Sequence, residues 1–173
     1  MRGRRGPVRR EGGGRFAIRL SDRERNAVRT FTGQLRQLLS SEDPSSDPAV
    51  ARLFPPALPD DVLANLEFEH EHGDELLRAR LEAIDTVERT LDRRHLDEAE
   101  LDAWLASLNA IRLVVGTRLG VTETSSEKDF EGDEQSVELF ELYRYMTWLE
   151  GWVIEALDQE LASGEPDDRG RGA

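Results

Sequence analysis

Few side chains in this sequence stand at a spacing that supports chemistry, and the clearest pattern is a Glu-x-x-His motif. Glu67 and His70 are three residues apart, so on a helix both lie on one side, as carboxylate-bridged metal sites require. A dinuclear centre needs a second copy of this motif and two further carboxylates. The only histidine outside this segment is His95, and His72 points to a different face from His70. The sequence therefore predicts no metal site.

Nucleophilic and thiol chemistry also lack the necessary residues. The 173 residues include no cysteine, which excludes disulfides, thiolate nucleophiles, Cys-ligated zinc and iron-sulfur clusters. No serine stands in a Gly-x-Ser-x-Gly elbow, and the glycines at positions 12 to 14 are followed by no P-loop lysine. The sequence predicts no catalytic residue, no cofactor and no enzyme.

The strongest functional signal is an uneven distribution of charge. Residues 1–36 hold eleven arginines and three acidic residues, a balance of +8, while the remaining 137 residues hold 12 basic and 33 acidic residues, a balance of -21. Basic N-terminal arms often contact phosphates, whereas an acidic body repels nucleic acid. On charge alone, a solvated and weakly interacting tail fits equally well. The candidate residues for binding nucleic acid or a partner are Arg4, Arg5, Arg9, Arg10, Arg15, Arg19, Arg23 and Arg25.

The elements that must position these arginines are predicted to be a β-hairpin and a helix. Residues 8–10 and 15–20 flank a glycine-rich turn, and the second run alternates apolar with other residues. Ser21 and Glu24 have the spacing of a capping box, which predicts a helix over about 22–40.

Four further helical segments are expected between residue 40 and Gly120. Residues 49–54 fit one or two helical turns before a proline-rich stretch, and a short helix is expected from about 60 to 68. We expect an interruption near Gly73 and then a longer helix over 74–94. Asp97 and Glu100 form a second capping box and open a helix that ends at Gly120.

The C-terminal part predicts a mobile acidic loop over 121–135 and a last helix over about 136–162. This helix is the most apolar, so we expect it to be central. Aromatic rings dominate interior packing, so three tryptophans are expected as core anchors: Trp104, Trp148 and Trp152.

These elements predict a mainly α fold, a compact bundle of about four to five helices preceded by a small N-terminal β-hairpin. The expected organisation is a disordered basic tail over 1–6, a single helical domain over 7–163 and a disordered tail over 164–173. No run is apolar enough for a membrane span or a secretory signal, which predicts a cytoplasmic protein. An apolar helix face that the core does not cover would contact a second copy of the chain, so a homodimer is an alternative.

Four stretches of the chain carry a family resemblance. They are DPAVARLFP at 47–55, ELLRARLEAIDTVERTL at 75–91, AWLASLNAIRLVVGTRLGVTE at 103–123 and WLEGWVIEAL at 148–157. Together they resemble the actinobacterial AosR-like family, formerly uncharacterised, whose genes lie beside the ClpS adaptor, a JAMM-type metallopeptidase, a sulfur-carrier protein and a cysteine synthase. The similarity covers most of residues 15–160, and the LNxxRLxxGTRLGV run is its specific part.

The resemblance implies a transcriptional regulator of oxidative stress tied to sulfur-carrier-dependent cysteine synthesis. Such a regulator would use its basic N-terminus on DNA or an acidic face on RNA polymerase or a sigma factor. The alternative is a protein-interaction adaptor in Clp proteolysis or sulfur-carrier processing. Because this chain has no cysteine, the thiol-sensing property of a redox regulator does not carry over to it.

Overall fold

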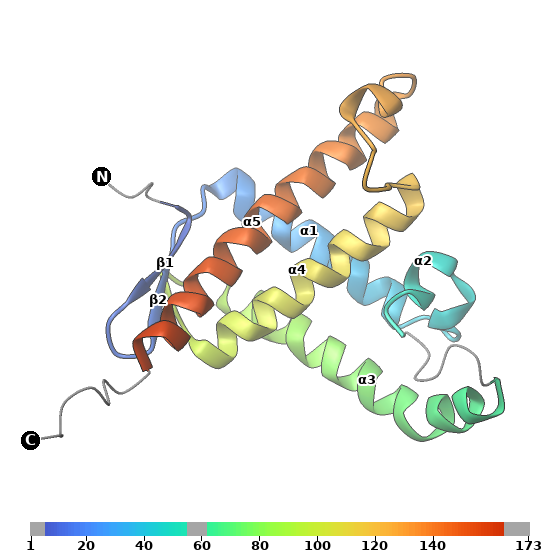
Figure 1. The fold of residues 1–173 in the computed structure, drawn as a ribbon, viewed down its shortest axis with the longest axis horizontal. Coiled ribbons are helices and arrows are strands. Elements are labelled where there is room, and N and C mark those ends of the chain that lie inside the picture. Colours follow the sequence, from blue (N-terminus) through green and yellow to red (C-terminus); the bar gives the residue numbers. More distant parts are fainter. Residues whose placement is uncertain (1–5, 55–61, 165–173) are drawn as a thin grey trace, which may run out of the picture.

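The computed structural model describes residues 6–54 and 62–164, with side chains over 6–54 and 72–159. Within these ranges the chain forms five α-helices and a small three-stranded sheet that lies against one end of the helices (Figure 1). The predicted mainly helical fold with an N-terminal hairpin is confirmed. The predicted tails fall outside the described residues, apart from Gly6 and Gly164.

The hairpin pairs β1 (Val8–Glu11) with β2 (Arg15–Ile18) in antiparallel register. Its turn requires glycine because Gly13 and Gly14 have φ of 79° and 69°, in the left-handed region. A third strand, β3 (His95–Asp97), pairs antiparallel with β2 and was not predicted. A strand of three residues with a single buried side chain has too little alternation to be recognised from sequence.

Helix α1 (Asp22–Leu39) and helix α4 (Glu98–Leu119) both begin at the capping boxes that the sequence predicts. In α4, Gly120 closes the helix at φ 65°, as expected for a left-handed C-cap. Between them lie a 3-10 turn (Pro44–Ser46), the short α2 (Pro48–Ala51) and the long α3 (Val62–Thr90).

Two predicted boundaries are wrong in the region of α3. The helix runs without interruption through Gly73, because one interior glycine costs only about 1 kcal/mol and does not stop a long helix. It ends at Thr90 and not near residue 94, because the chain turns there into β3. The acidic segment 121–135 contains a 3-10 turn (Glu127–Phe130), and its mobility stays a prediction.

The core lies where α4 packs against α3 and α5 (Glu134–Gly164), with α5 also covering β1. Trp104 is fully buried in α4, as predicted. The prediction for α5 is wrong for Trp148, which is 47% exposed, and Trp152 is only partly buried. Met146 and Leu149 fill the interior from α5 instead, and Met146, two residues before Trp148, lies on the opposite side of the helix from it.

Candidate nucleic-acid interface

Several arginines of the basic N-terminal region are used to hold α1 against α3. Arg25 donates a hydrogen bond to the carbonyl oxygen of Leu91, just past the end of α3. Arg29 pairs with Asp92 at 3.0 Å, and Arg36 pairs with Glu88 at 2.9 Å, which raises the pKa of the Arg36 guanidinium. A cation close to the last carbonyls of a helix also complements the helix dipole. The role of these three side chains in the structure is therefore to join two helices.

On the outer face of the sheet, charged side chains of β1 and β3 contact one another. Arg9, Ala17 and His95 are register partners on β1, β2 and β3, so their side chains share that face. Glu11 accepts from Arg9 at 2.8 Å and lies 3.2 Å from His95 Nε2. The hydrogen bond from Arg9, then the charge of His95, lowers the pKa of Glu11. One carboxylate thus ties β1 to β3 across the sheet.

A third set of arginines is exposed and unpaired. Within the part of the chain that the structure describes, Arg15, Arg19, Arg23 and Arg94 form no ion pair or side-chain hydrogen bond. Arg10 is partly buried and has a partner. Arg4 and Arg5 lie outside the described residues. The ion pairs therefore separate arginines that stabilise the fold from arginines that are available to an anion.

Two of the available arginines line an open polar hollow of about 650 Å³. It lies where β2 leads into α1 and where the end of α3 leads into β3, segments that are far apart in sequence. Backbone hydrogen bonds fix these segments together, from Ile18 N to Arg94 O at 2.9 Å and from Arg19 N to Pro7 O at 2.7 Å. The charged residues that line the hollow are Arg19, Arg25, Arg94, His95, Asp22 and Asp92.

The charge of this basic hollow favours an anion of phosphate type. Arg29 neutralises Asp92 from beside the hollow, and among the described residues Arg19 and Arg94 form no ion pair or side-chain hydrogen bond. Arginine forks match the geometry of phosphate oxygens, and a concave basic surface concentrates anions. The hollow brings together two of the predicted residues, Arg19 and Arg25. It does not include the predicted Arg9, Arg15 or Arg23.

Sequence reasoning missed Arg94 and His95. His95 is the first residue of β3 and Arg94 precedes it, and the pairing of β3 with β2 brings both beside the N-terminal region. The Arg93-Arg94-His95 run was a local signal, because it is a basic cluster inside the acidic part of the chain. Arg93 itself is bound to Glu100 at 2.9 Å.

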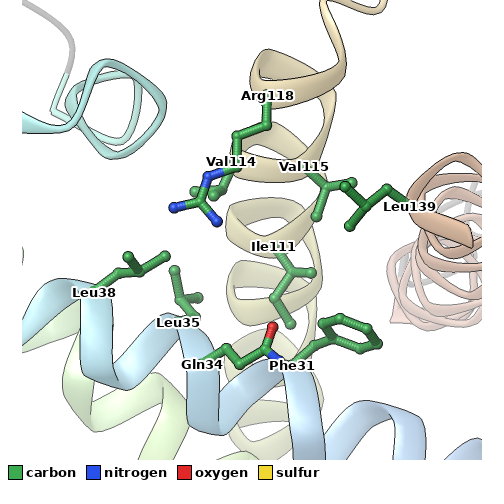
Figure 2. Close-up of a pocket in the computed structure, with 9 residues that line it drawn as sticks. All are labelled: Phe31, Gln34, Leu35, Leu38, Ile111, Val114, Val115, Arg118 and Leu139. Atoms are coloured by element: carbon green, nitrogen blue, oxygen red, sulfur yellow. The ribbon is translucent and has the colours of Figure 1, made fainter. Parts of the chain in front are cut away.

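A second cavity is a narrow apolar crevice between α1 and α4 (Figure 2). Its volume of about 40 Å³ has room for only one or a few water molecules. Arg118 reaches over the crevice and pairs with Asp47 at 3.0 Å, which helps to lower the pKa of Asp47 after the hydrogen bond from Ala49 N. The crevice is a packing seam. Its apolar lining is Phe31, Leu35, Leu38, Ile111, Val114, Val115 and Leu139.

No group of three or more metal-ligating side chains occurs among the described residues. Glu67 and His70 lie in α3, but their side chains are outside the described set. No described helix is both long and apolar enough to cross a bilayer.

The chain is similar to mycobacterial proteins that are named as regulators of oxidative stress. It is 30% identical over 136 residues to a putative oxidative stress regulator AosR of Mycobacterium leprae, covering 76% of this chain and 61% of that protein. It is 25% identical over 182 residues to the oxidative stress regulators AosR of Mycobacterium bovis and Mycobacterium tuberculosis, covering 84% of this chain and 83% of each relative.

No solved structure matches the chain significantly. A family model described as a domain of unknown function, DUF2017, matches residues 1–157. That range includes the hairpin, the basic hollow and most of α5, so the candidate interface lies inside the matched region. The chain belongs to the DUF2017 family.

Proposed function

We propose that this protein is a non-enzymatic regulator of the oxidative-stress response that acts on transcription and contacts DNA phosphates through its basic hollow. The observation that carries this proposal is the convergence of unpaired Arg19 and Arg94 on one open polar surface, in a molecule of net charge -13. The names of the mycobacterial relatives support the regulatory role. The family resemblance adds the link to sulfur-carrier-dependent cysteine synthesis.

The charge distribution limits the strength of such DNA binding. The acidic body opposes the approach of a duplex, so the hollow and the N-terminal arginines have to act against the field of the rest of the molecule. We infer that DNA binding by this protein alone is weak. RNA polymerase or a sigma factor is the proposed partner that holds it at the promoter.

The DNA contact is tested with Arg19→Glu/Arg94→Glu, which reverses two exposed charges in the hollow. Each lost phosphate contact is expected to reduce the slope of log affinity against log salt by about 0.9, and affinity at low salt falls by at least about tenfold. Fluorescence anisotropy with labelled duplex DNA at several salt concentrations measures both quantities.

The matched control is Arg52→Glu/Arg78→Glu, which changes the net charge equally. Arg52 follows α2, and Arg78 lies about three turns before the end of α3, so neither lines the hollow. Equal losses in both double variants would show that only net charge matters. If no form binds DNA and a Clp or sulfur-carrier protein is captured instead, the adaptor function replaces this proposal. Truncation of residues 1–15 is a poorer test, because it removes β1 and the buried Val8.

The response to peroxide is expected to be indirect. The chain's only sulfur atoms are in Met1 and Met146, and Met146 is 0% exposed. Hydrogen peroxide is therefore expected to leave the mobility on non-reducing gels and the circular dichroism spectrum unchanged, because no thiol can be oxidised. A conformational change that persists in Met146→Leu would contradict this prediction.

A further inference from the structure

An exposed indole on α5 lies between two carboxylates. Trp148 is 47% exposed, and its ring contacts only the neighbouring Tyr145 ring, at 5.7 Å between centroids, among the described aromatic residues. Glu141 and Glu155 stand seven residues before and after it and are also exposed, so all three share one face of the helix. Each glutamate lies about 10 Å along the helix from Trp148. An indole face between two carboxylates therefore suits a guanidinium group, which stacks on the ring while the negative charge of this face attracts it.

The arginine nearest in sequence does not fill this position. Arg144 stands four residues before Trp148 and pairs with Glu127 at 3.2 Å. No cation–π contact involves Trp148 among the described residues. The ring is thus left without a cation from the described part of the chain.

The N-terminal segment enters the described structure beside this face. An added Cβ at Gly6 would lie 2.2 Å from a ring carbon of Trp152, so the Gly6 backbone rests on that ring and only glycine fits. Trp152 follows Trp148 by four residues, which places it on a neighbouring position of the same face about 6 Å along the helix. Arg5 and Arg4 stand one and two residues before Gly6, so their backbone extends up to about 3.5 and 7 Å beyond it, and a long side chain adds to this reach. Arg4 and Arg5 are therefore within reach of Trp148.

We propose that residues 1–5, the basic arm, dock on this face of α5 with the guanidinium of Arg4 or Arg5 over the Trp148 ring. The arm carries three arginines and no acidic residue, which complements Glu141 and Glu155. The occupant is then a segment of this chain and not a second copy, whose like net charge would oppose association. One further step rests on the proposed function, in which the N-terminal arginines also contact DNA. The α5 face and DNA phosphates then compete for the same arginines.

The docking is tested in the full chain, without DNA, by fluorine NMR of 5-fluorotryptophan protein. The Trp148 resonance is assigned with Trp148→Phe, and its access to solvent is measured with a neutral gadolinium chelate. In Arg4→Ser/Arg5→Ser the ratio of docked to free arm is expected to fall by about 2- to 5-fold for each lost cation–π contact, with higher relaxation enhancement at Trp148. Glu141→Gln/Glu155→Gln is also expected to lower the ratio of docked to free arm, because it removes the negative charge that attracts the arginines.

Arg52→Ser/Arg78→Ser removes the same charge elsewhere and is expected to leave the Trp148 resonance unchanged. An arm variant with the wild-type Trp148 shift and relaxation would overturn the docking. Duplex DNA is then added to the wild type, and competition predicts that Trp148 becomes more accessible. If DNA binds and Trp148 does not change, the competition is wrong. If DNA does not bind but the arm variant frees Trp148, the docking stands and the proposed DNA contact fails.

Discussion

Replacing Trp104 with alanine is expected to lower the free energy of unfolding by about 3–5 kcal/mol, because it leaves a large cavity in the centre of the bundle. Trp104 is 0% exposed, and its Nε1 donates to the hydroxyl of Thr90 at 2.9 Å. Thr90 in turn donates to the Thr86 carbonyl oxygen at 2.6 Å. The substitution therefore removes both packing and the indole link between α4 and α3. Urea denaturation followed by far-ultraviolet circular dichroism measures the loss.

Trp148→Ala is the control for this experiment, since it deletes the same side chain from the surface of α5. With a ring that is 47% exposed, the expected cost is less than about 1 kcal/mol. Similar losses at both positions would mean that Trp148 is packed as tightly as Trp104, which would contradict the difference in exposure between the two rings.

The contrast between these tryptophans shows what the sequence can predict about α5. Its apolar residues are so frequent that helical periodicity identifies the helix but not the face that is buried. The capping boxes at Ser21 and Asp97 were predictable because each depends on two residues three positions apart. The hairpin was equally local, since its glycine turn and the alternation in β2 lie within one short segment.

The candidate site was less predictable because it depends on contacts between distant segments. Arg25 looks like any other arginine of the basic region, yet its partners are carbonyl groups at the end of α3, 66 and 68 residues away. Arg94 is in the acidic part of the chain and joins the hollow only because β3 pairs with β2. Charge composition therefore located the basic region, and the fold divides it into paired and available arginines.

A related long-range pair joins the two helices that dominate the core. Arg112 on α4 lies 2.8 Å from Glu150 on α5, measured from Nε to Oε2, and the contact is an ion pair and not a well-directed hydrogen bond. Glu150 is only 8% exposed. Burial raises the pKa of its carboxyl above the ordinary 4.5, and the charge of Arg112 partly offsets that rise. The arginine is thus what makes an ionised carboxylate tolerable at this position.

Arg112→Ala is therefore expected to lower the free energy of unfolding at pH 7 by about 3 kcal/mol, because it leaves a buried carboxylate without its cation. A folded-state pKa above the unfolded value means that the native state binds the extra proton, so the loss should shrink as the pH falls toward 4.5. Urea denaturation at pH 7 and pH 4.5 measures both values. Glu150→Gln in the Arg112→Ala background should recover most of the stability at pH 7, since no charge remains buried. A loss of the same size at both pH values would show that Arg112 acts through packing of its stem alone.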